Sequence, residues 1–522
     1  MGTGCFSKSK SYVVRSDIKE AKNTPWQKVL AMVLFLVFAV AFVATLTLLL
    51  QNDETPNNAK IPSMTEIQTT SNTFIEPNRT IETTTNSTKT TTEIQTTPFL
   101  ISGPNVTVGS RGKEFIVLFT KNIVNSTKNV YVTSENSVQM NITTSPYLNA
   151  SYKDQIDRTE IIQSSQHIIL PNELELKSFR KEIKSVLIET SSDVFLISHD
   201  DGYGTVGSTT HIPLHKLSTK YVVISTEPEA TRTSQVAMSA IEDNSTISIT
   251  FKMKRNVPLI IEGKTFYRGD VFNLFLDRFE TYQIEHSTDL TGTFIESSVP
   301  IAVFSGNDCN QLENTGACDH LIEQLPPITS VDKTYIVPPN SDDRDTLIRI
   351  TAIENSIISY KIGSSSQPIT LTKFDSFDTR ISSSQTCFIE SDVPLLVTAF
   401  GLNSRSSTLG DPSMTIIPGL DQYIDYYKII VPSGYDHNYV SIMMKHFSKD
   451  SLRINSTVIN AGDLVFEENV SYGNVTYNVR SIRVVEGELT ASTLNGERFG
   501  LVFAGVTYYE AYGFSGNSML LD

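Results

Sequence analysis

The chain has 522 residues, 39% of them hydrophobic, with four cysteines and a formal net charge of -15 at pH 7. The acidic balance excludes a nucleic-acid-binding protein, because phosphate backbones are bound by clustered Lys and Arg. Four cysteines in so long a chain also exclude a fold that is held together mainly by disulfides.

Residues 29–50 are the first predicted element, a run of 22 residues without a charged side chain. As an α-helix this run would be about 33 Å long, enough to cross the hydrocarbon core of a bilayer. Residues 1–28 carry six basic and two acidic side chains, a net of +4, whereas Asp53 and Glu54 are the first charges after the run. This bias predicts a single-pass type II plasma-membrane protein with residues 1–28 as a cytoplasmic tail. A cleaved signal peptide is the alternative, but its apolar run is typically shorter.

Residues 51–99 are dominated by Thr, Ser, Asn, Pro and Glu, and the string TEIQTT occurs twice, at 65–70 and 92–97. Such a segment cannot bury enough apolar surface to offset its ordering entropy, so we expect a disordered Ser/Thr-rich stalk. Ten Asn-x-Ser/Thr sequons all follow the predicted membrane helix, in agreement with an extracellular carboxy-terminal part. The predicted N-glycosylation sites are Asn78, Asn86, Asn105, Asn125, Asn141, Asn149, Asn244, Asn455, Asn469 and Asn474.

From about residue 100 onward, short apolar runs rich in Val, Ile, Phe, Tyr and Thr alternate with turn-forming residues, which predicts an all-β ectodomain over 100–522. Similar strings recur: KEFIV at 113–117, KYVVI at 220–224, KTYIV at 333–337 and YKIIV at 427–431. FIESSVPIAV at 294–303 likewise resembles FIESDVPLLV at 388–397. We therefore expect four tandem β-sandwich-like repeats of about 100 residues each. Their expected bounds are 112–218, 219–331, 332–425 and 426–522. Residues 172–189 alone would suit a helix, but the repeat favours a strand there.

Three longer strings carry a family resemblance: VFSGNDC at 303–309, ACDHLIEQLPP at 317–327 and KTYIVPP at 333–339. Together with GKEF at 112–115 and GDPSMTIIP at 410–418, they are similar to the IgGFc-binding domain family. The likeness covers about residues 100–520. It implies an extracellular recognition module without known catalytic residues, whose family name refers to immunoglobulin Fc.

The four cysteines have different expected fates. Cys309 and Cys318 enclose a polar loop in an oxidising compartment, which favours a disulfide between them. Cys387 remains, either as a buried thiol or as an intermolecular bridge. Cys5, near the amino terminus, is a candidate for acylation.

The longest polar loops occur at the same phase of the repeat, at 199–211, 307–319 and 402–413. If the repeats share a fold, these loops emerge from the same end, where β scaffolds usually bind their ligands. Sequence drift on solvated loops is the alternative. The candidate binding residues are Asp200, Asp201, Asn307, Asp308, Asp319, His320 and Asp411. His211 and His215 have zinc-like spacing, but Pro213 between them opposes a helix, so we expect no metal and no cofactor.

These features predict a cell-surface recognition or adhesion protein rather than an enzyme, because no nucleophile or phosphate-binding motif is present. We expect it to bind an extracellular protein or glycan of immunoglobulin or mucin type, with a membrane contact through residues 29–50 and no nucleic acid. A carbohydrate-active ectoenzyme and a structural mucin-like coat component are the alternatives.

Overall fold

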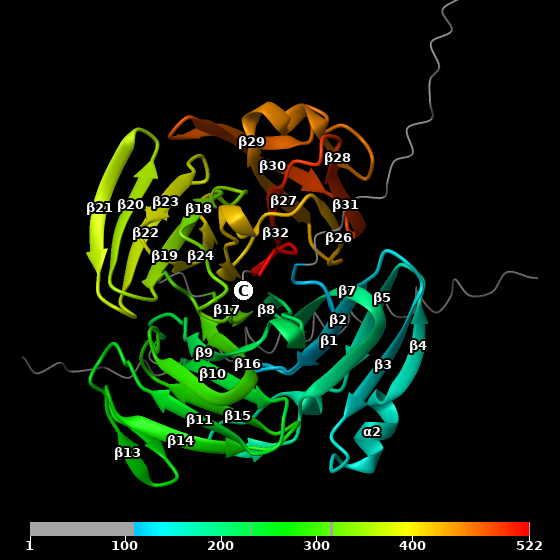
Figure 1. The fold of residues 1–522 in the computed structure, drawn as a ribbon, viewed down its shortest axis with the longest axis vertical. Coiled ribbons are helices and arrows are strands. Elements are labelled where there is room, and N and C mark those ends of the chain that lie inside the picture. The colour runs from blue at the N-terminus through cyan, green and yellow to red at the C-terminus, as the bar shows by residue number, and fades with distance from the viewer. Residues whose placement is uncertain (1–108, 230, 314–316, 521–522) are drawn as a thin grey trace, which may run out of the picture. The chain divides into compact units, whose positions relative to one another are not determined.

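The computed structural model describes residues 109–229, 231–313 and 317–520, which belong to a compact unit spanning Thr96–Asp522. Strands dominate this part of the chain (Figure 1), and its one described α-helix is the short α2 (Ala150–Ile156). The predicted all-β architecture is therefore confirmed. The expected tail, membrane helix and stalk, residues 1–28, 29–50 and 51–99, lie outside the described residues. Within the described ranges, no helix has the length and apolarity needed to span a bilayer.

We describe the strands as four consecutive groups along the chain, coloured from blue to red in Figure 1. β6 is placed in the first group by its position in the chain, although it pairs with β15 of the second. The first group comprises β1 (Gly112–Val117), β2 (Ser126–Thr133), β3 (Val138–Thr144), β4 (Arg158–Ile162), β5 (Ser165–Leu170), β6 (Lys181–Glu182), β7 (Val186–Gly202) and β8 (Thr205–Thr210). The second comprises β9 (Ser218–Val222), β10 (Ser234–Ala240), β11 (Ser245–Thr250), β12 (Leu259–Ile261), β13 (Lys264–Phe266), β14 (Val271–Leu276), β15 (Thr281–His286), β16 (Phe294–Asn310) and β17 (Asp319–Gln324).

The third group comprises β18 (Thr334–Val337), β19 (Arg344–Ala352), β20 (Ser356–Ile362), β21 (Ser365–Leu371), β22 (Ser376–Ile381), β23 (Cys387–Ser391), β24 (Leu395–Ser404) and β25 (Ser413–Ile416). The fourth comprises β26 (Tyr426–Val431), β27 (His437–Lys445), β28 (Leu452–Ile454), β29 (Leu464–Tyr472), β30 (Val475–Val484), β31 (Gly487–Thr493), β32 (Phe499–Thr507) and β33 (Glu510–Ser515). Short 3-10 turns lie between strands: η1 (Asn172–Leu174), η2 (Leu214–Lys216), η3 (Leu420–Gln422) and η4 (His446–Ser451). Residues 172–189 contain η1, β6 and the start of β7, and no α-helix.

One long strand joins two sheets in each of the first two groups. The amino-terminal half of β7 pairs with β1 and β3, and its carboxy-terminal half pairs with β2 and β8. β16 pairs in the same way with β9 and β11, then with β10 and β17. In the third group the corresponding path is broken into β23 and β24, and Pro394 lies in the gap. A proline cannot donate to the ladder, so it suits the point at which a strand changes sheet.

The two sheets of a group enclose an apolar core. In the first group this core contains Val130, Ile142, Ile188 and Leu196, all fully buried. Burying a side chain of this size contributes about 1.5–3 kcal/mol each. β19 shows the two-residue period of a strand: Ile348 and Ile350 enter the third core, while Arg349 points the other way and binds Asp289 of the second group.

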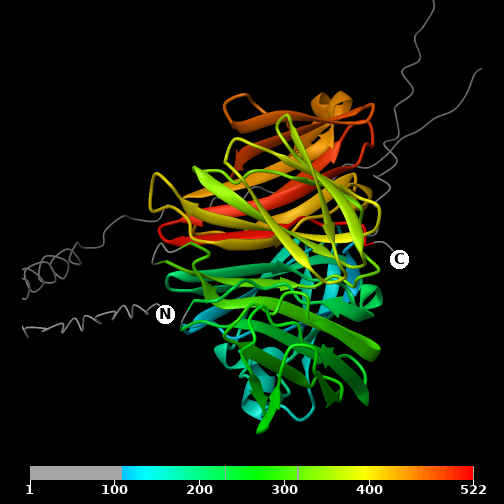
Figure 2. The ribbon, with the colours of Figure 1, turned by 90° about the vertical axis from the view of Figure 1, so that its left-hand side faces the viewer.

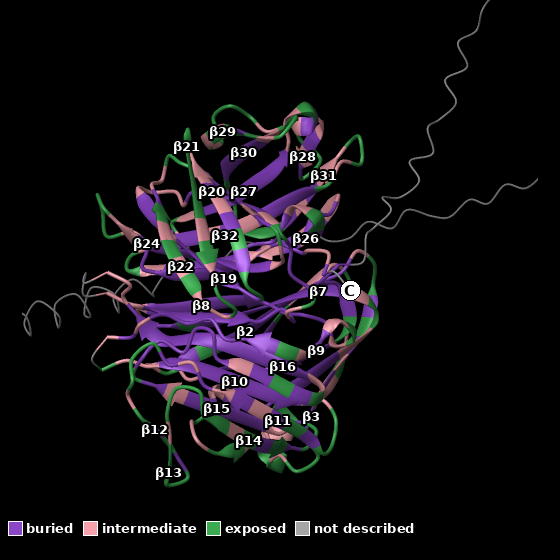
Figure 3. Cartoon of the chain, turned by 60° about the vertical axis from the view of Figure 1, so that its left-hand side comes forward, coloured by how far each residue is buried: buried purple, intermediate pink, exposed green. Residues whose placement is uncertain are grey.

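The last strands of the four groups meet at the centre. β8 packs against β17 and β33, and β25 packs against the same two strands, so the four contacts form a closed cycle. Figure 3 shows β8 and its neighbours as almost continuously buried. The two ends of the described chain also meet, because the Ser110 amide donates to the Ser518 carbonyl (2.6 Å). The first and fourth groups are thereby tied by a polar bond as well as by packing.

Candidate functional site

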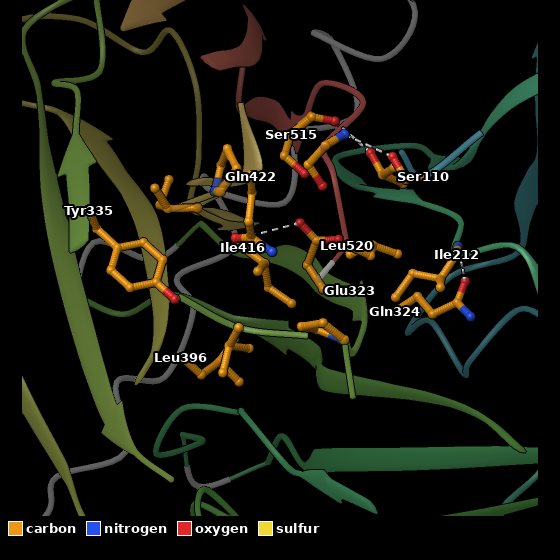
Figure 4. A pocket seen from close by; sticks show the side chains of 16 residues that line it. Ser110, Ile212, Glu323, Gln324, Tyr335, Leu396, Ile416, Gln422, Ser515 and Leu520 are labelled. Atoms are coloured by element: carbon orange, nitrogen blue, oxygen red, sulfur yellow. Dashed lines mark hydrogen bonds between the residues drawn. The ribbon is translucent and has the colours of Figure 1, made fainter. Parts of the chain in front are cut away.

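Asp319 and Glu323 on β17 link the second group to the other three. The Asp319 carboxylate accepts hydrogen bonds from the amides of Val206 on β8 (2.8 Å) and Ala511 on β33 (2.7 Å). The Glu323 carboxylate accepts from the Thr209 hydroxyl (2.7 Å) and from the Ile416 amide (3.0 Å), the second of which is drawn in Figure 4. Burial raises the pKa of Glu323 to about 8. It also raises the pKa of Asp319 well above its usual value, and the neighbouring Asp411 adds to this effect.

A second buried network surrounds Lys128. Its ammonium donates to Asp200 and Glu175, both at 2.8 Å, and to the Ser126 hydroxyl at 2.7 Å. Burial alone would raise the pKa of Asp200, but Lys128 and the hydrogen bond from His320 outweigh it and hold this pKa below its usual value. A buried charge is tolerated only when it is paired and hydrogen bonded, and Lys128 meets both conditions.

Thr120, His320 and Asp200 have the hydrogen-bond order of a hydrolase triad. The two nitrogens of His320 lie 3.0 Å from the Thr120 hydroxyl and 2.9 Å from Asp200. However, all three side chains are at most 3% exposed, and Gln235 also contacts the same His320 nitrogen. In this structure the three residues join β17 to β7 and to the segment that follows β1, and a substrate has no access to the hydroxyl.

Six of the seven predicted binding residues are buried, and Asp201 alone is exposed. The Asn307 amide oxygen accepts from the Thr226 amide (2.9 Å), and Asp308 accepts from the Thr233 amide (2.8 Å). Burial raises the pKa of Asp411 to about 6, although the neighbouring Arg344 acts in the opposite direction. All six buried candidates make their contacts within the fold, so their side chains cannot contact a macromolecular ligand. They are Asp200, Asn307, Asp308, Asp319, His320 and Asp411.

The cysteines follow the expectation for an oxidising compartment. Cys309 and Cys318 form a disulfide with a Cα–Cα distance of 5.4 Å, which closes the β16–β17 hairpin. Cys387 on β23 is a buried free thiol, and burial raises its pKa to about 12, so the thiolate is scarce. His211 is also buried and bonds to Ser198 and the Ile116 carbonyl. Where the chain is described, no group of three or more His, Cys, Asp or Glu side chains is placed to hold a metal ion.

The exposed functional candidates are at the hairpin ends, beyond the buried residues. Tyr203 at the β7–β8 turn is 98% exposed, and Tyr508 and Tyr509 at the β32–β33 turn are 64% and 39% exposed. Arg405, in the β24–β25 loop, is also exposed and pairs with Asp343. We call Asp201, Tyr203, Arg405, Tyr508 and Tyr509 the tip surface. Tyr203 lies in the 199–211 loop that the sequence marked as polar, whereas Tyr508 and Tyr509 lie in none of the loops singled out from sequence. Their exposure could not be inferred from sequence.

Backbone hydrogen bonds fix these hairpin ends to one another. The Gly204 amide donates to the Glu510 carboxylate (2.8 Å), which joins the first and fourth groups. The Tyr509 amide donates to the Thr408 carbonyl (2.9 Å) and the Gly410 amide to the Thr507 carbonyl (2.8 Å), which join the third and fourth groups. Figure 2 shows the yellow β24–β25 loop and the red β32–β33 hairpin side by side at its left. The loops are therefore held in place before any ligand arrives.

A cleft of about 690 Å³ continues from the tip surface into the fourth group. Asp436 lies on its wall and accepts a hydrogen bond from the Thr507 hydroxyl (2.9 Å), so the cleft and the β32–β33 hairpin are continuous. Tyr435, Arg483 and Val485 also line it. Tyrosine and arginine contribute large contact areas with polar ends, and a preordered surface loses little entropy on binding. This arrangement suits the binding of a protein surface.

The comparison with protein families decides the assignment. The family model described as IgGFc binding protein matches residues 207–505, from within β8 to within β32. This chain belongs to the IgGFc-binding family. The match includes β17 with Asp319, His320 and Glu323, so the string that carried the resemblance forms the buried centre of the structure.

A human protein named IgGFc-binding protein is 27% identical over 220 residues, which are 42% of this chain and 4% of that protein. The chain thus spans only a small part of that relative. A solved structure, titled as a Ca2+-stabilized adhesin with which an Antarctic bacterium binds ice, is 11% identical and covers 79% of this chain and 99% of its own. Its TM-score of 0.10 supports no conclusion about this fold.

Proposed function

We propose that this chain is a non-catalytic recognition or adhesion protein that binds an extracellular protein through its tip surface. The observation that carries the proposal is the set of exposed tyrosines, Tyr203, Tyr508 and Tyr509, on hairpin ends that are hydrogen bonded to one another. Exposed aromatic side chains on a rigid scaffold are typical of protein interfaces. Because the family and its human member are named for IgG Fc, we propose an immunoglobulin Fc region as the first partner to test.

We further propose that residues 100–522 consist of four copies of one two-sheet unit. Strand registers support this: Phe115 pairs with Ile188, and Tyr221, Tyr335 and Tyr427 pair with Ile295, Ile389 and Ala491 in the corresponding strands. The hydroxyls of these three tyrosines donate to the carbonyls of Ile301, Leu395 and Phe499. In this register Phe115, Tyr221, Tyr335 and Tyr427 occupy equivalent positions. Lys113 lies two residues before its aromatic residue and Lys220 only one, so these two lysines are not equivalent.

The membrane arrangement is also a proposal. Residues 29–50 would anchor the chain, residues 1–28 would lie in the cytoplasm and the stalk of 51–99 would raise the ectodomain from the plasma membrane. Two features support this arrangement: residues 29–50 carry no charge over 22 residues, and residues 1–28 before them are basic. Exposure of the sequon asparagines agrees with glycosylation: Asn125, Asn149, Asn244, Asn455, Asn469 and Asn474 are exposed, and Asn141 is half-buried.

The test uses the full-length chain, purified in a mild detergent and immobilised, with an IgG Fc fragment and a panel of secreted proteins as analytes. We expect saturable binding to at least one analyte. Added salt should weaken this binding only in part, because the tyrosine contacts are mostly apolar. Binding that is unchanged when Tyr203, Tyr508 and Tyr509 are all replaced by alanine would exclude the tip surface. Turnover of a glycoside by the same preparation would instead favour the ectoenzyme alternative.

A further inference from the structure

A second concave site lies between the second and third strand groups, remote in sequence from the tip surface. Its volume is about 300 Å³, at the lower end of the range typical of small-molecule sites. One wall comes from the segment after β11, with Lys252 and Lys254, and from Arg268 in the β13–β14 turn. The facing wall comes from residues 374–378, at the start of β22.

The two walls are firmly joined beneath the site. The rings of Phe294 and Phe374 stack with centroids 4.9 Å apart. Lys252 donates to the Asp375 carboxylate at 2.5 Å, and Arg349 binds Asp289 at 2.9 Å and Asp378 at 2.7 Å. The hollow is therefore a fixed feature of the interface between the groups, and its floor charges are already paired.

Two cations at the rim differ from those on the floor. Among the described residues, neither the Lys254 ammonium nor the Arg268 guanidinium makes a hydrogen bond or an ion pair within 4 Å, and both side chains are exposed. Arg268 is near enough to Asp375 to help lower the pKa of that carboxyl. Four cations and three carboxylates line the site, a net of +1, in a chain whose formal net charge is -15. An anionic group entering the hollow would meet these two unpaired cations.

The remaining lining suits a sugar. Phe374 is half-buried and provides an apolar wall, while Asp375, Ser376 and Asp378 present oxygen atoms that can accept hydrogen bonds from hydroxyl groups. The Phe377 ring packs on the other side of β22, against Tyr360 of the third core. Small-molecule sites commonly combine such apolar walls with a few placed polar groups. No sequon occurs between Asn244 and Asn455, so none lies on the segments that line the site.

We propose that this hollow binds an anionic sugar residue, whose carboxylate or sulfate pairs with Lys254 and Arg268 and whose hydroxyls bind Asp375 and Asp378. The site is separate from the tip surface, so the two proposals can fail independently. Carboxylated and sulfated sugars share the required chemistry, and the experiment distinguishes them.

The test is ligand-observed NMR on the full-length chain in detergent, after enzymatic removal of its own sialic acids. The probes are 3′-sialyllactose, 3′-sulfolactose, neutral lactose and inorganic sulfate. We expect one or both anionic sugars to bind with a Kd on the order of 1 mM and at least about tenfold more tightly than lactose. Preference between the two anionic probes identifies the source of the charge.

The combined Lys254→Gln and Arg268→Gln variant should weaken anionic-sugar binding by at least about tenfold, because it removes both unpaired cations. Lys264→Gln is the matched control, an exposed lysine on β13 that does not line the site. All three replaced side chains are exposed, so we expect unchanged unfolding temperatures. Three results would overturn the proposal. Lactose could bind as tightly as the anionic sugars, or the double variant could bind them as tightly as the parent chain. Inorganic sulfate could also displace the bound sugar at concentrations as low as those at which sialyllactose does.

Discussion

The Asp319 carboxylate accepts a hydrogen bond from the amide of Ala511, which follows it by 192 residues in the chain. Its other oxygen accepts from the Val206 amide, 113 residues before it. One buried side chain on β17 therefore holds the first and fourth groups against the second, and several consequences of such links can be measured.

Replacing Asp319 by alanine should lower the free energy of unfolding by about 3 kcal/mol, because two buried amides lose their acceptor. Urea unfolding of the full-length chain, followed by fluorescence, measures this loss. Asp201→Ala is the control, because that carboxylate is exposed and should change stability by less than about 0.5 kcal/mol. Equal effects of the two substitutions would contradict a structural role for Asp319.

Glu323→Gln should alter how stability depends on pH. Burial raises the pKa of Glu323 to about 8 in the folded chain, above its ordinary value of 4.5. A raised pKa means that the folded state holds the proton more tightly, so this stabilisation is complete below about pH 4.5 and is lost as the pH rises to about 8. The glutamine side chain does not titrate. The free energy of unfolding of the variant, relative to that of the wild type, should therefore rise by an amount on the order of 3 kcal/mol between pH 5 and pH 8. Thermal unfolding at both pH values provides the comparison, and parallel pH profiles would argue against a buried, titrating Glu323.

Loss of the Cys309–Cys318 disulfide in the double serine variant should cost about 2–3 kcal/mol, because the short hairpin loop gains freedom in the unfolded chain. The unfolding temperature reports this change.

In the parent protein, a thiol reagent should modify Cys387 only after denaturation, and Cys387→Ala is the control for that labelling. Labelling of Cys387 in the native protein would show that this strand is more open than its burial indicates.

Alanine at both Tyr203 and Tyr508 should weaken binding of the protein partner by about 2 kcal/mol or more without changing the unfolding temperature, because exposed aromatic anchors contribute mainly to interfaces. Surface plasmon resonance with the partner found in the screen measures the loss. Tyr147→Ala is the matched control, since this tyrosine is 85% exposed but lies before α2 in the first group. If Tyr147→Ala weakened binding as much, the contact would lie elsewhere.

The exposed sequon asparagines should carry N-glycans when the full-length chain is made in a eukaryotic secretory pathway. Asn141 is half-buried on β3, where its amide oxygen accepts from the Thr159 hydroxyl, so we expect the lowest occupancy there. Mass spectrometry of peptides after enzymatic glycan release gives the occupancy of each site. Unmodified asparagine at every sequon would contradict an extracellular position for residues 100–522.

The sequence by itself determined the strand-rich nature of this chain, because two-residue alternation and Gly/Asn/Ser turns act within a few residues. It also indicated the Cys309–Cys318 pair. Those properties depend on local chemistry and on the compartment. The FIESSVPIAV and FIESDVPLLV strings indicated a repeat, and the structure showed that the chain changes sheet within them. The family strings are equally local, and the family match over residues 207–505 agrees with them.

Only the tertiary structure decided which polar residues are buried. Asp319, His320 and Asp411 have the composition of a binding loop, yet all three are buried. Asp319 accepts from amides of the first and fourth groups, and His320 bonds to Thr120 and Asp200 of the first group. Tertiary structure also fixed the strand register, in which a shift of one residue exchanges the buried and exposed faces. The burial of Asp319 and His320 depends on partners more than a hundred residues away, and most strand registers depend on partners tens of residues away. A short stretch of sequence contains no information about which distant strand will lie beside it.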